Sequence, residues 1–260
     1  SWGTLKNQPG PDGRIRPIHL RQAFSIERSR PLPQGFEVPR AYSVPDAAFD
    51  ADFQAEIRGG DGVTVLWGPP GRGKSTYLSH CVAAIDPAAA VCIRHHYFLS
   101  LDDRSEGRFH YNAIARSFEH QLEQESSDLI GLRQSLGDLI ATAAGRLAAE
   151  GRRLVIVIDG LDHVWRENRN HEEMEEVFNA LLPLPANVRL VVGTQKIAPQ
   201  HLPARLLQTL PTDQWRALPL MSPTAVRKWL DRQDAAGRLN LEVPDHRTRA
   251  QGLAKVARAL

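Results

Sequence analysis

One glycine-rich segment constrains the fold of this chain more than any other, because it lies between an apolar run and a helical pattern. The segment reads Gly68, Pro69, Pro70, Gly71, Arg72, Gly73, Lys74, Ser75 and Thr76. It matches G-x-x-x-x-G-K-[ST], follows the apolar run 63–67 and precedes an expected helix over residues 75–85. Glycines let backbone N–H groups turn inward, and these donors bind a polyphosphate together with the positive end of the helix. We expect the Lys74 ammonium to reach the β- and γ-phosphates of a nucleotide and the Ser75 hydroxyl to ligate Mg²⁺. The whole segment is therefore predicted to form a nucleotide-binding loop.

Short apolar runs alternate with helical periods along the rest of the chain. The runs 154–158 and 189–193 are rich in Val, Leu and Ile, as in strands that are buried on both faces of a parallel sheet. We expect strands at 63–67, 90–98, 154–158, 189–193 and 214–218. We expect helices at 45–57, 75–85, 111–125, 128–150, 172–182, 202–207 and 223–235. The predicted fold is α/β: a P-loop NTPase core of three layers, αβα, with a central parallel sheet.

Three segments are expected along the chain. Residues 1–45 are rich in Pro, Gly and Arg and are interpreted as an extended lead-in. Within it, the stretch 36–40 is interpreted as a linker, with packing near the nucleotide base as the alternative. Residues 46–220 form the predicted P-loop NTPase core, and residues 221–260 the start of a small helical domain. The chain does not begin with Met and ends inside a helical pattern, so we expect it to be a fragment of a longer protein.

Composition narrows the expected partners and location. The chain carries 32 basic and 30 acidic residues, a formal net charge of +2, which is too small to indicate nucleic acid or an acidic membrane as a partner. No apolar run reaches the roughly 18 residues of a membrane-spanning helix, and the start of the chain does not match a signal peptide. Cys81 and Cys92 lie in an expected helix and an expected strand. Buried reduced thiols and a cytoplasmic location are therefore expected.

The second half of the nucleotide site is expected after the apolar run 154–158. This run ends at Asp159, and α/β proteins bind their ligands at the carboxyl ends of parallel strands. Asp159 is therefore predicted to hold Mg²⁺ alongside Ser75. Asp162 follows closely and is the best-placed carboxylate to orient an attacking water, with a helix N-cap as the alternative. His163 is interpreted either as a contact of the γ-phosphate region or as a bystander.

Two adjacent histidines lie near the end of the expected second strand. Neighbouring residues on a strand point to opposite faces, so His95 and His96 cannot easily share one metal ion. No Cys or carboxylate spacing near them completes a ligand set. A structural role is therefore preferred over a metal site at these positions.

The order of these motifs resembles a known class of ATPases. The nucleotide-binding loop is followed by Asp-Gly-Leu-Asp at 159–162, then by Thr194 at the end of a strand, then by a Ser-Pro-capped helix from residue 222. Over residues 63–231 this order is similar to that of STAND-class P-loop ATPases, above all the NACHT branch of bacterial defence and innate-immune signalling proteins, with AAA+ ATPases as neighbours. The resemblance implies that Thr194 is the first sensor of the γ-phosphate. It also implies slow ATP hydrolysis, regulation of a larger signalling protein, and protein partners or self-association through that parent protein.

Two departures from these families limit the expected rate of hydrolysis. The NACHT branch typically continues Asp-Gly-hydrophobic-Asp with Glu, and His163 stands at the position of that glutamate. AAA+ enzymes place a catalytic glutamate directly after the Mg²⁺-binding aspartate, and Gly160 stands there. The predicted catalytic residues are Lys74, Asp159, Asp162 and Thr194. Nucleotide binding with slow turnover is therefore predicted.

ATP or ADP is the expected nucleotide. The guanine-specific pattern Asn-Lys-x-Asp does not occur, and the Gly-Pro-Pro-Gly opening at 68–71 resembles that of ATPases. Four functions stay open at this point. They are a STAND-type ATPase switch, an AAA+-like motor or loader, a small-molecule kinase with Arg104 and Arg108 in its lid, and a scaffold that holds ADP with little turnover.

Overall fold

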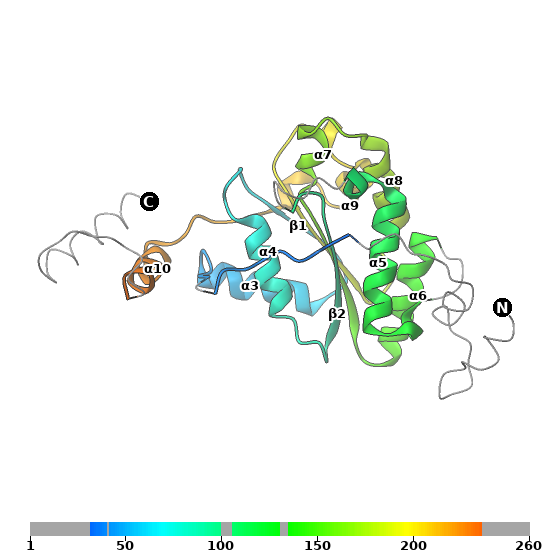
Figure 1. Ribbon diagram of the computed structural model, residues 1–260, viewed down its shortest axis with the longest axis horizontal. Coiled ribbons are helices and arrows are strands. Elements are labelled where there is room, and N and C mark those ends of the chain that lie inside the picture. The colour runs from blue at the N-terminus through cyan, green and yellow to red at the C-terminus, as the bar shows by residue number, and fades with distance from the viewer. Residues whose placement is uncertain (1–31, 41, 100–105, 131–134, 236–260) are drawn as a thin grey trace, which may run out of the picture.

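A parallel sheet of five strands lies at the centre of the chain (Figure 1). The computed structural model describes residues 32–40, 42–99, 106–130 and 135–235. The strands are β1 (Gly62–Trp67), β2 (Ala90–His96), β3 (Arg153–Asp159), β4 (Val188–Thr194) and β5 (Arg216–Ala217). Their order in the sheet is β2-β3-β4-β1-β5, and every neighbouring pair is parallel. The carboxyl ends of the strands therefore meet at one edge of the sheet, where α/β folds place their ligands.

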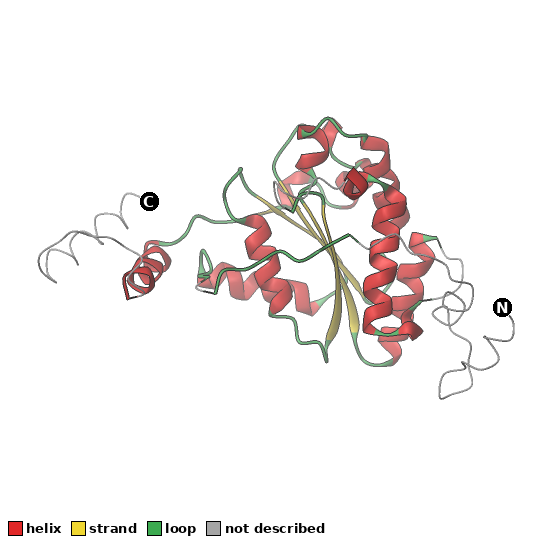
Figure 2. Ribbon diagram, viewed as in Figure 1, coloured by secondary structure: helices red, strands yellow, loops and turns green. Residues whose placement is uncertain are grey.

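Helices cover both faces of this sheet (Figures 1 and 2). On one face lie α3 (Ala47–Gly59) and α4 (Lys74–Ala83), and on the other lie α5 (Tyr111–Glu125), α6 (Leu136–Ala149) and α8 (His171–Leu181). The shorter helices are α7 (Asp162–Arg166) and α9 (Ala204–Thr209), at the top of the view in Figure 1. The predicted three-layer α/β fold with a central parallel sheet is confirmed.

The strands are apolar on both sides because each face of the sheet packs against helices. Along β3, the side chains of Leu154, Ile156 and Ile158 belong to the core under α5, α6 and α8. Those of Val155 and Val157 belong to the core under α3 and α4. Burial of each such side chain contributes roughly 1.5–3 kcal/mol relative to exposure. The continuous apolar run therefore reflects two-sided burial, as predicted.

Helix α10 (Pro223–Ala235) lies apart from the two helical layers (Figure 1). The Ser222 hydroxyl accepts a hydrogen bond from the Ala225 N–H at 3.1 Å, which confirms the predicted cap. The Ser222 N–H donates to the Pro45 carbonyl at 2.7 Å, so the start of α10 contacts the segment before α3. A domain boundary after residue 220 stays a prediction.

Four elements differ from the prediction, and one of them is the strand expected at 214–218, which is limited to β5 at Arg216–Ala217. Of the helix expected at 128–150, the structure has α6 at Leu136–Ala149. The Ser135 hydroxyl caps its start by accepting a hydrogen bond from the Asp138 N–H at 3.2 Å. The strand expected to reach residue 98 ends at His96. Helix α7 has no counterpart in the prediction, because a single helical turn carries too little periodicity to be recognised.

Some predicted segments lie outside the described residues. They are 1–31 and 41 of the lead-in, 100–105 of the loop after β2, 131–134 of the helix expected at 128–150, and 236–260 of the C-terminal helical unit. Arg104, on which the kinase alternative depends, is among them. Of the helices that the structure describes, none has both the length and the apolar character that a membrane crossing requires.

Candidate nucleotide-binding site

The predicted nucleotide-binding loop connects β1 to α4, as the motif requires. Gly71 and Gly73 have positive φ angles of 73° and 87°, a left-handed backbone that glycine adopts without strain. Gly73 is the N-cap residue of α4, and no side chain caps the helix there. The first N–H groups of α4 are therefore free of a side-chain acceptor and suited to an anion.

Lys74 is the first residue of α4, and its side chain turns back over the loop. Its Nζ donates to the carbonyl of Gly68 at 2.8 Å and to that of Pro69 at 3.2 Å. Lys74 is only 9% exposed, and this burial lowers the pKa of its ammonium, while Asp162 and Asp159 act in the opposite direction. The lysine charge thus lies within electrostatic range of both predicted carboxylates.

Asp159 ends β3, and its side chain is only 1% exposed. It pairs across the sheet with His96 of β2 and Gly193 of β4. The His96 Nδ1 lies 3.3 Å from Oδ2 of Asp159, whereas Oδ1 is buried without a hydrogen-bond partner among the described residues. Burial alone would raise the pKa of Asp159, but the hydrogen bond and charge of His96, with contributions from Ser75 and Lys74, hold it below its usual value. The contact with His96 therefore favours the ionised form of Asp159.

Gly193 on β4 leaves the space that the Asp159 carboxylate occupies. A Cβ at this position would lie 2.1 Å from Oδ1 of Asp159 and 2.6 Å from Cδ1 of Leu78. The Gly193 carbonyl also accepts the Gly160 N–H at 2.8 Å, just after the carboxylate. Gly193 was not among the site residues predicted from the sequence. The available signal was its place inside an apolar strand, where a glycine often marks the close approach of another group.

The donors around Asp159 fit a magnesium ion that is bound together with a nucleotide. Mg²⁺ prefers oxygen ligands and is usually held by one or two carboxylates plus substrate phosphates. Asp159 Oδ1 is a buried carboxylate oxygen with no partner in the described chain, and the Ser75 hydroxyl is close enough to lower the Asp159 pKa. Within the described ranges, no group of three or more His, Cys, Asp or Glu side chains could hold a metal ion. The residues that would hold a magnesium ion here are Asp159 and Ser75, with phosphate oxygens of the nucleotide as further ligands.

Asp162 is the first residue of α7, and it does not cap that helix. The N-cap residue is Leu161, and no side-chain cap bond is formed, so the N-cap alternative is wrong. Instead, Oδ1 of Asp162 accepts the Gln195 N–H at 3.2 Å. Its Oδ2 lies 3.6 Å from the Arg166 guanidinium. The buried carboxylate thus ties α7 to the end of β4.

Thr194 ends β4 beside the start of the nucleotide-binding loop. It pairs with Trp67 of β1, and its carbonyl accepts the Gly68 N–H at 3.4 Å. The Thr194 hydroxyl donates to the Gln195 carbonyl at 3.1 Å. The fold therefore brings Thr194 next to the loop, and its sensor role stays a prediction.

His163 packs against the chain that follows β2. Its imidazole stacks on the Phe98 ring, with centroids 4.4 Å apart and planes 5° from parallel. Its Nδ1 lies 3.2 Å from Oε1 of Glu167, one turn further along α7. The contacts of the His163 side chain are therefore with Phe98 and with Glu167 at the end of its own helix. Neither contact bears on the γ-phosphate interpretation, which stays open.

The imidazole rings of the two adjacent histidines contact different groups. His95 Nε2 lies 2.9 Å from the Arg108 carbonyl, and burial lowers the His95 pKa to about 3, so its imidazole stays neutral. His96 contacts Asp159 instead. Sequence reasoning missed this contact with the predicted metal ligand because it arises from the register of β2 against β3, which local patterns do not encode.

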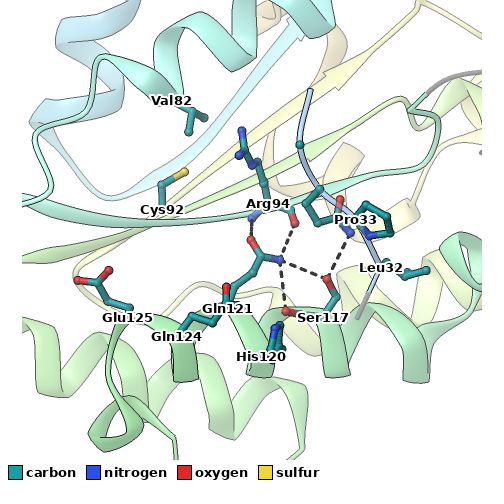
Figure 3. A pocket seen from close by; sticks show the side chains of 12 residues that line it. Leu32, Pro33, Val82, Cys92, Arg94, Ser117, His120, Gln121, Gln124 and Glu125 are labelled. Carbon is teal, nitrogen blue, oxygen red and sulfur yellow. Dashed lines mark hydrogen bonds between the residues drawn. The ribbon is translucent and has the colours of Figure 1, made fainter. Parts of the chain in front are cut away.

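A groove of about 500 Å³ borders the free edge of β2, and none of its lining residues belongs to the nucleotide-binding loop (Figure 3). The lead-in, β2 and α5 contribute Leu32, Pro33, Arg94, Ser117 and Gln121, among others. Figure 3 shows the Gln121 amide against the Arg94 backbone, where it accepts the N–H at 2.8 Å and donates to the carbonyl at 2.9 Å. The groove is therefore separate from the predicted nucleotide site.

The chain matches the model of one known protein family. The family model of the AAA domain matches residues 57–199, which is more than half of the chain. The chain therefore belongs to the AAA domain family, a class of P-loop NTPases, and this membership supports a nucleotide as its ligand. The finer STAND or NACHT placement is not part of this assignment. A comparison with curated proteins gave no match.

Several solved structures are similar to the chain. The ORC1 protein of Aeropyrum pernix, in complex with DNA, is 18% identical with a TM-score of 0.46, over 81% of this chain and 54% of that one. The ORC2 protein of the same organism, in ADPNP–ADP complexes, is 13% identical with a TM-score of 0.46, over 77% and 56%. Cdc6p of Pyrobaculum aerophilum is 14% identical with a TM-score of 0.40, over 76% and 52%. The chain spans about half the length of these structures.

Proposed function

We propose that this AAA domain binds ATP or ADP with Mg²⁺ and acts as a slow nucleotide-dependent switch in a larger protein. The observation that carries this proposal is a pair of buried carboxylates, Asp159 and Asp162, beside the loop. Each keeps one oxygen without a hydrogen bond among the described residues, Oδ1 of Asp159 and Oδ2 of Asp162, and the Ser75 hydroxyl lies close enough to Asp159 to lower its pKa. Asp162 is already bonded to the Gln195 N–H and faces Arg166. The first suits a metal ligand, and the second is a restrained candidate for orienting water.

Each predicted site residue has a place in this proposal. The N–H groups at the start of α4 and the Lys74 ammonium bind the phosphates. Ser75 and Asp159 would hold Mg²⁺, which neutralises charge on the phosphates when it is bound. Asp162 orients the attacking water. Thr194, at the end of the neighbouring strand, contacts the γ-phosphate as a sensor.

Slow ATP hydrolysis is expected because a glycine, Gly160, directly follows Asp159. Gly160 occupies the position of the AAA+ catalytic glutamate and has a φ of 84°. Asp162 is the remaining candidate base, and its contacts with the Gln195 N–H and the Arg166 guanidinium restrain its movement toward a water. ATP and ADP states that interconvert slowly persist long enough to regulate an attached domain.

The STAND or NACHT assignment belongs to this proposal and is supported by the link from the site into α7. The Asp-Gly-Leu-Asp sequence at 159–162 runs from the end of β3 into this helix. Through Asp162, α7 is joined to the end of β4. The same helix carries Trp165, a large aromatic side chain that is 49% exposed. A change at the γ-phosphate would therefore reach a surface that suits a protein partner or self-association.

The proposal is tested by identifying the nucleotide that the protein carries and by measuring its turnover. Purified protein is denatured, and the released nucleotide is separated by chromatography. We expect ADP in near-stoichiometric amounts and slow ATP hydrolysis in the refilled protein. An empty site together with fast hydrolysis would contradict the switch. It would favour an AAA+-like motor or loader, the second candidate, which the family membership supports.

Asp162→Asn tests the water-orienting role. Asparagine keeps an oxygen for the Gln195 N–H, so the fold is expected to stay intact while turnover falls about 100-fold. The matched control is Asp86→Asn, at an exposed turn whose carboxylate accepts the Ala88 N–H at 2.9 Å. Its turnover should equal that of the wild type. Equal turnover in Asp162→Asn and the wild type would remove Asp162 from the mechanism.

A further inference from the structure

A short segment of the lead-in reaches the metal side of the candidate site. This segment, residues 33–36, is named the arm and lies ahead of the AAA match at 57–199. Oε1 of Gln34 accepts the His96 N–H at 2.9 Å. The Phe36 ring stacks on the His96 imidazole, with centroids 5.7 Å apart and planes at 29°. The arm therefore contacts both the backbone and the ring of the histidine that bonds Asp159.

Buried polar groups fix the arm in this position. The Arg108 guanidinium, 1% exposed, donates to the Pro33 carbonyl at 2.5 Å and to the His96 carbonyl at 3.1 Å. The Gln34 amide donates to the Ser117 hydroxyl of α5 at 3.3 Å. Figure 3 shows Leu32 and Pro33 beside Ser117 and Arg94, at the edge of the sheet. Buried hydrogen-bonded networks of this kind specify one geometry.

The contact between His96 and Asp159 divides the carboxylate into a held oxygen and a free one. His96 Nδ1 lies 3.3 Å from Oδ2 of Asp159, in the place of a donor to this carboxylate oxygen. Oδ1 lies in the space above Gly193 without a partner in the described chain. One oxygen thus fixes the orientation, and the other is left for a ligand. Donors behind metal ligands commonly orient them in this way.

We propose that His96 is a positioning residue for the magnesium ligand Asp159, and that the arm holds His96 in place through Phe36 and Gln34. This inference rests on the proposed Mg²⁺–nucleotide site. It gives the chain ahead of the AAA domain a physical route to the metal ligand, through one stacked ring and one hydrogen bond. The position of the arm would then set how strongly Mg²⁺ strengthens nucleotide binding.

The test measures the affinity of a fluorescent ADP analogue with and without Mg²⁺, and the ratio of the two affinities is the magnesium gain. His96→Leu removes the donor, and Phe36→Ala removes the stacked ring. Each should lower the magnesium gain about tenfold and leave the magnesium-free affinity unchanged, because the loop and Lys74 are untouched. His96→Asn places an N–H donor near the position of Nδ1, so it should keep most of the magnesium gain that His96→Leu loses. The control is Glu37→Ala, at an exposed neighbour of the arm, which should match the wild type.

The outcomes separate this inference from the proposed function. A wild-type protein that binds no nucleotide would overturn the proposed function, and this inference with it. A wild-type protein with a magnesium gain that His96→Leu and Phe36→Ala both keep would overturn this inference alone. Equal losses in His96→Leu and His96→Asn would also overturn the donor role. Thermal unfolding verifies that each variant is folded, and the half-buried Phe36 provides a second variant in case His96→Leu does not fold.

Discussion

At the level of single residues, the position of the Asp159 carboxylate requires a glycine at position 193 on the neighbouring strand. Gly193→Ala would place a Cβ 2.1 Å from Oδ1 of Asp159 and 2.6 Å from Leu78. Neither neighbour can move freely in a packed interior, so we expect a loss of about 1–3 kcal/mol in the free energy of unfolding. The displaced carboxylate should also weaken the effect of Mg²⁺ on nucleotide binding. Urea denaturation and magnesium titration measure the two effects.

A matched substitution gives the opposite sign. A Cβ at Gly145, in the exposed face of α6, would meet nothing within 4 Å. Gly145→Ala should therefore raise the free energy of unfolding by about 0.5–1 kcal/mol, because alanine loses less backbone entropy in a helix. If Gly193→Ala were as stable as Gly145→Ala, the close approach of Asp159 to Gly193 would be wrong.

The residues that could be predicted from the sequence are those whose chemistry is written in a local motif. The glycines, Lys74 and Ser75 follow from the loop pattern, and Asp159 follows from its place at the end of an apolar run. His96 and Gly193 could not be found in this way. Their importance comes from lying opposite Asp159 on the two neighbouring strands, and register is a property of the folded sheet.

At the scale of elements, the edge strand β2 is completed by side-chain amides in place of a further strand. The Gln121 amide bonds both backbone groups of Arg94 (Figure 3), and the Gln34 amide accepts the next outward N–H, that of His96. Open strand edges are templates for unwanted pairing, and proteins cover them in several ways. Here α5 and the arm supply the cover.

Removing one amide should expose this edge. Gln121→Ala takes away the partner of the Arg94 N–H and carbonyl, so we expect the free energy of unfolding to fall by about 1–2 kcal/mol. Gln124→Ala, an exposed position on the same helix and groove, should change it by less than about 0.5 kcal/mol. Urea denaturation compares the two. Equal effects would mean that the Gln121 bonds contribute nothing to the stability of β2.

Elements with strong patterns were predictable, and those shaped by side-chain caps or by tertiary contacts were not. The apolar runs predicted β3 and β4 because both strands are buried on two faces. The helix expected at 128–150 is shorter because Ser135 provides a start signal inside the periodic stretch. Helix α7 is a single turn whose first residue, Asp162, accepts the Gln195 N–H after β4. Its sequence alone carries no such information.

For the whole molecule, strand order decides whether the motifs form one site. The order β2-β3-β4-β1-β5 puts β4 between β1 and β3. The end of β4 therefore touches the loop after β1 through Thr194 and the Asp159 carboxylate through Gly193. The sequence predicted the class of fold, but the order depends on long-range pairing that local periodicity does not encode.

We expect the loop at 68–76 to bind a nucleotide phosphate chain through Lys74, and calorimetric titration with Mg²⁺–ATP measures this binding. The wild-type protein should bind ATP. Lys74→Ala should weaken binding by about 100-fold, as expected for the loss of a charge-assisted contact with phosphate. Arg58→Ala, which removes an exposed cation that bonds Gln54 on α3, serves as the control and should bind like the wild type. An unchanged ATP affinity in Lys74→Ala would mean that the loop at 68–76 does not bind the nucleotide through Lys74.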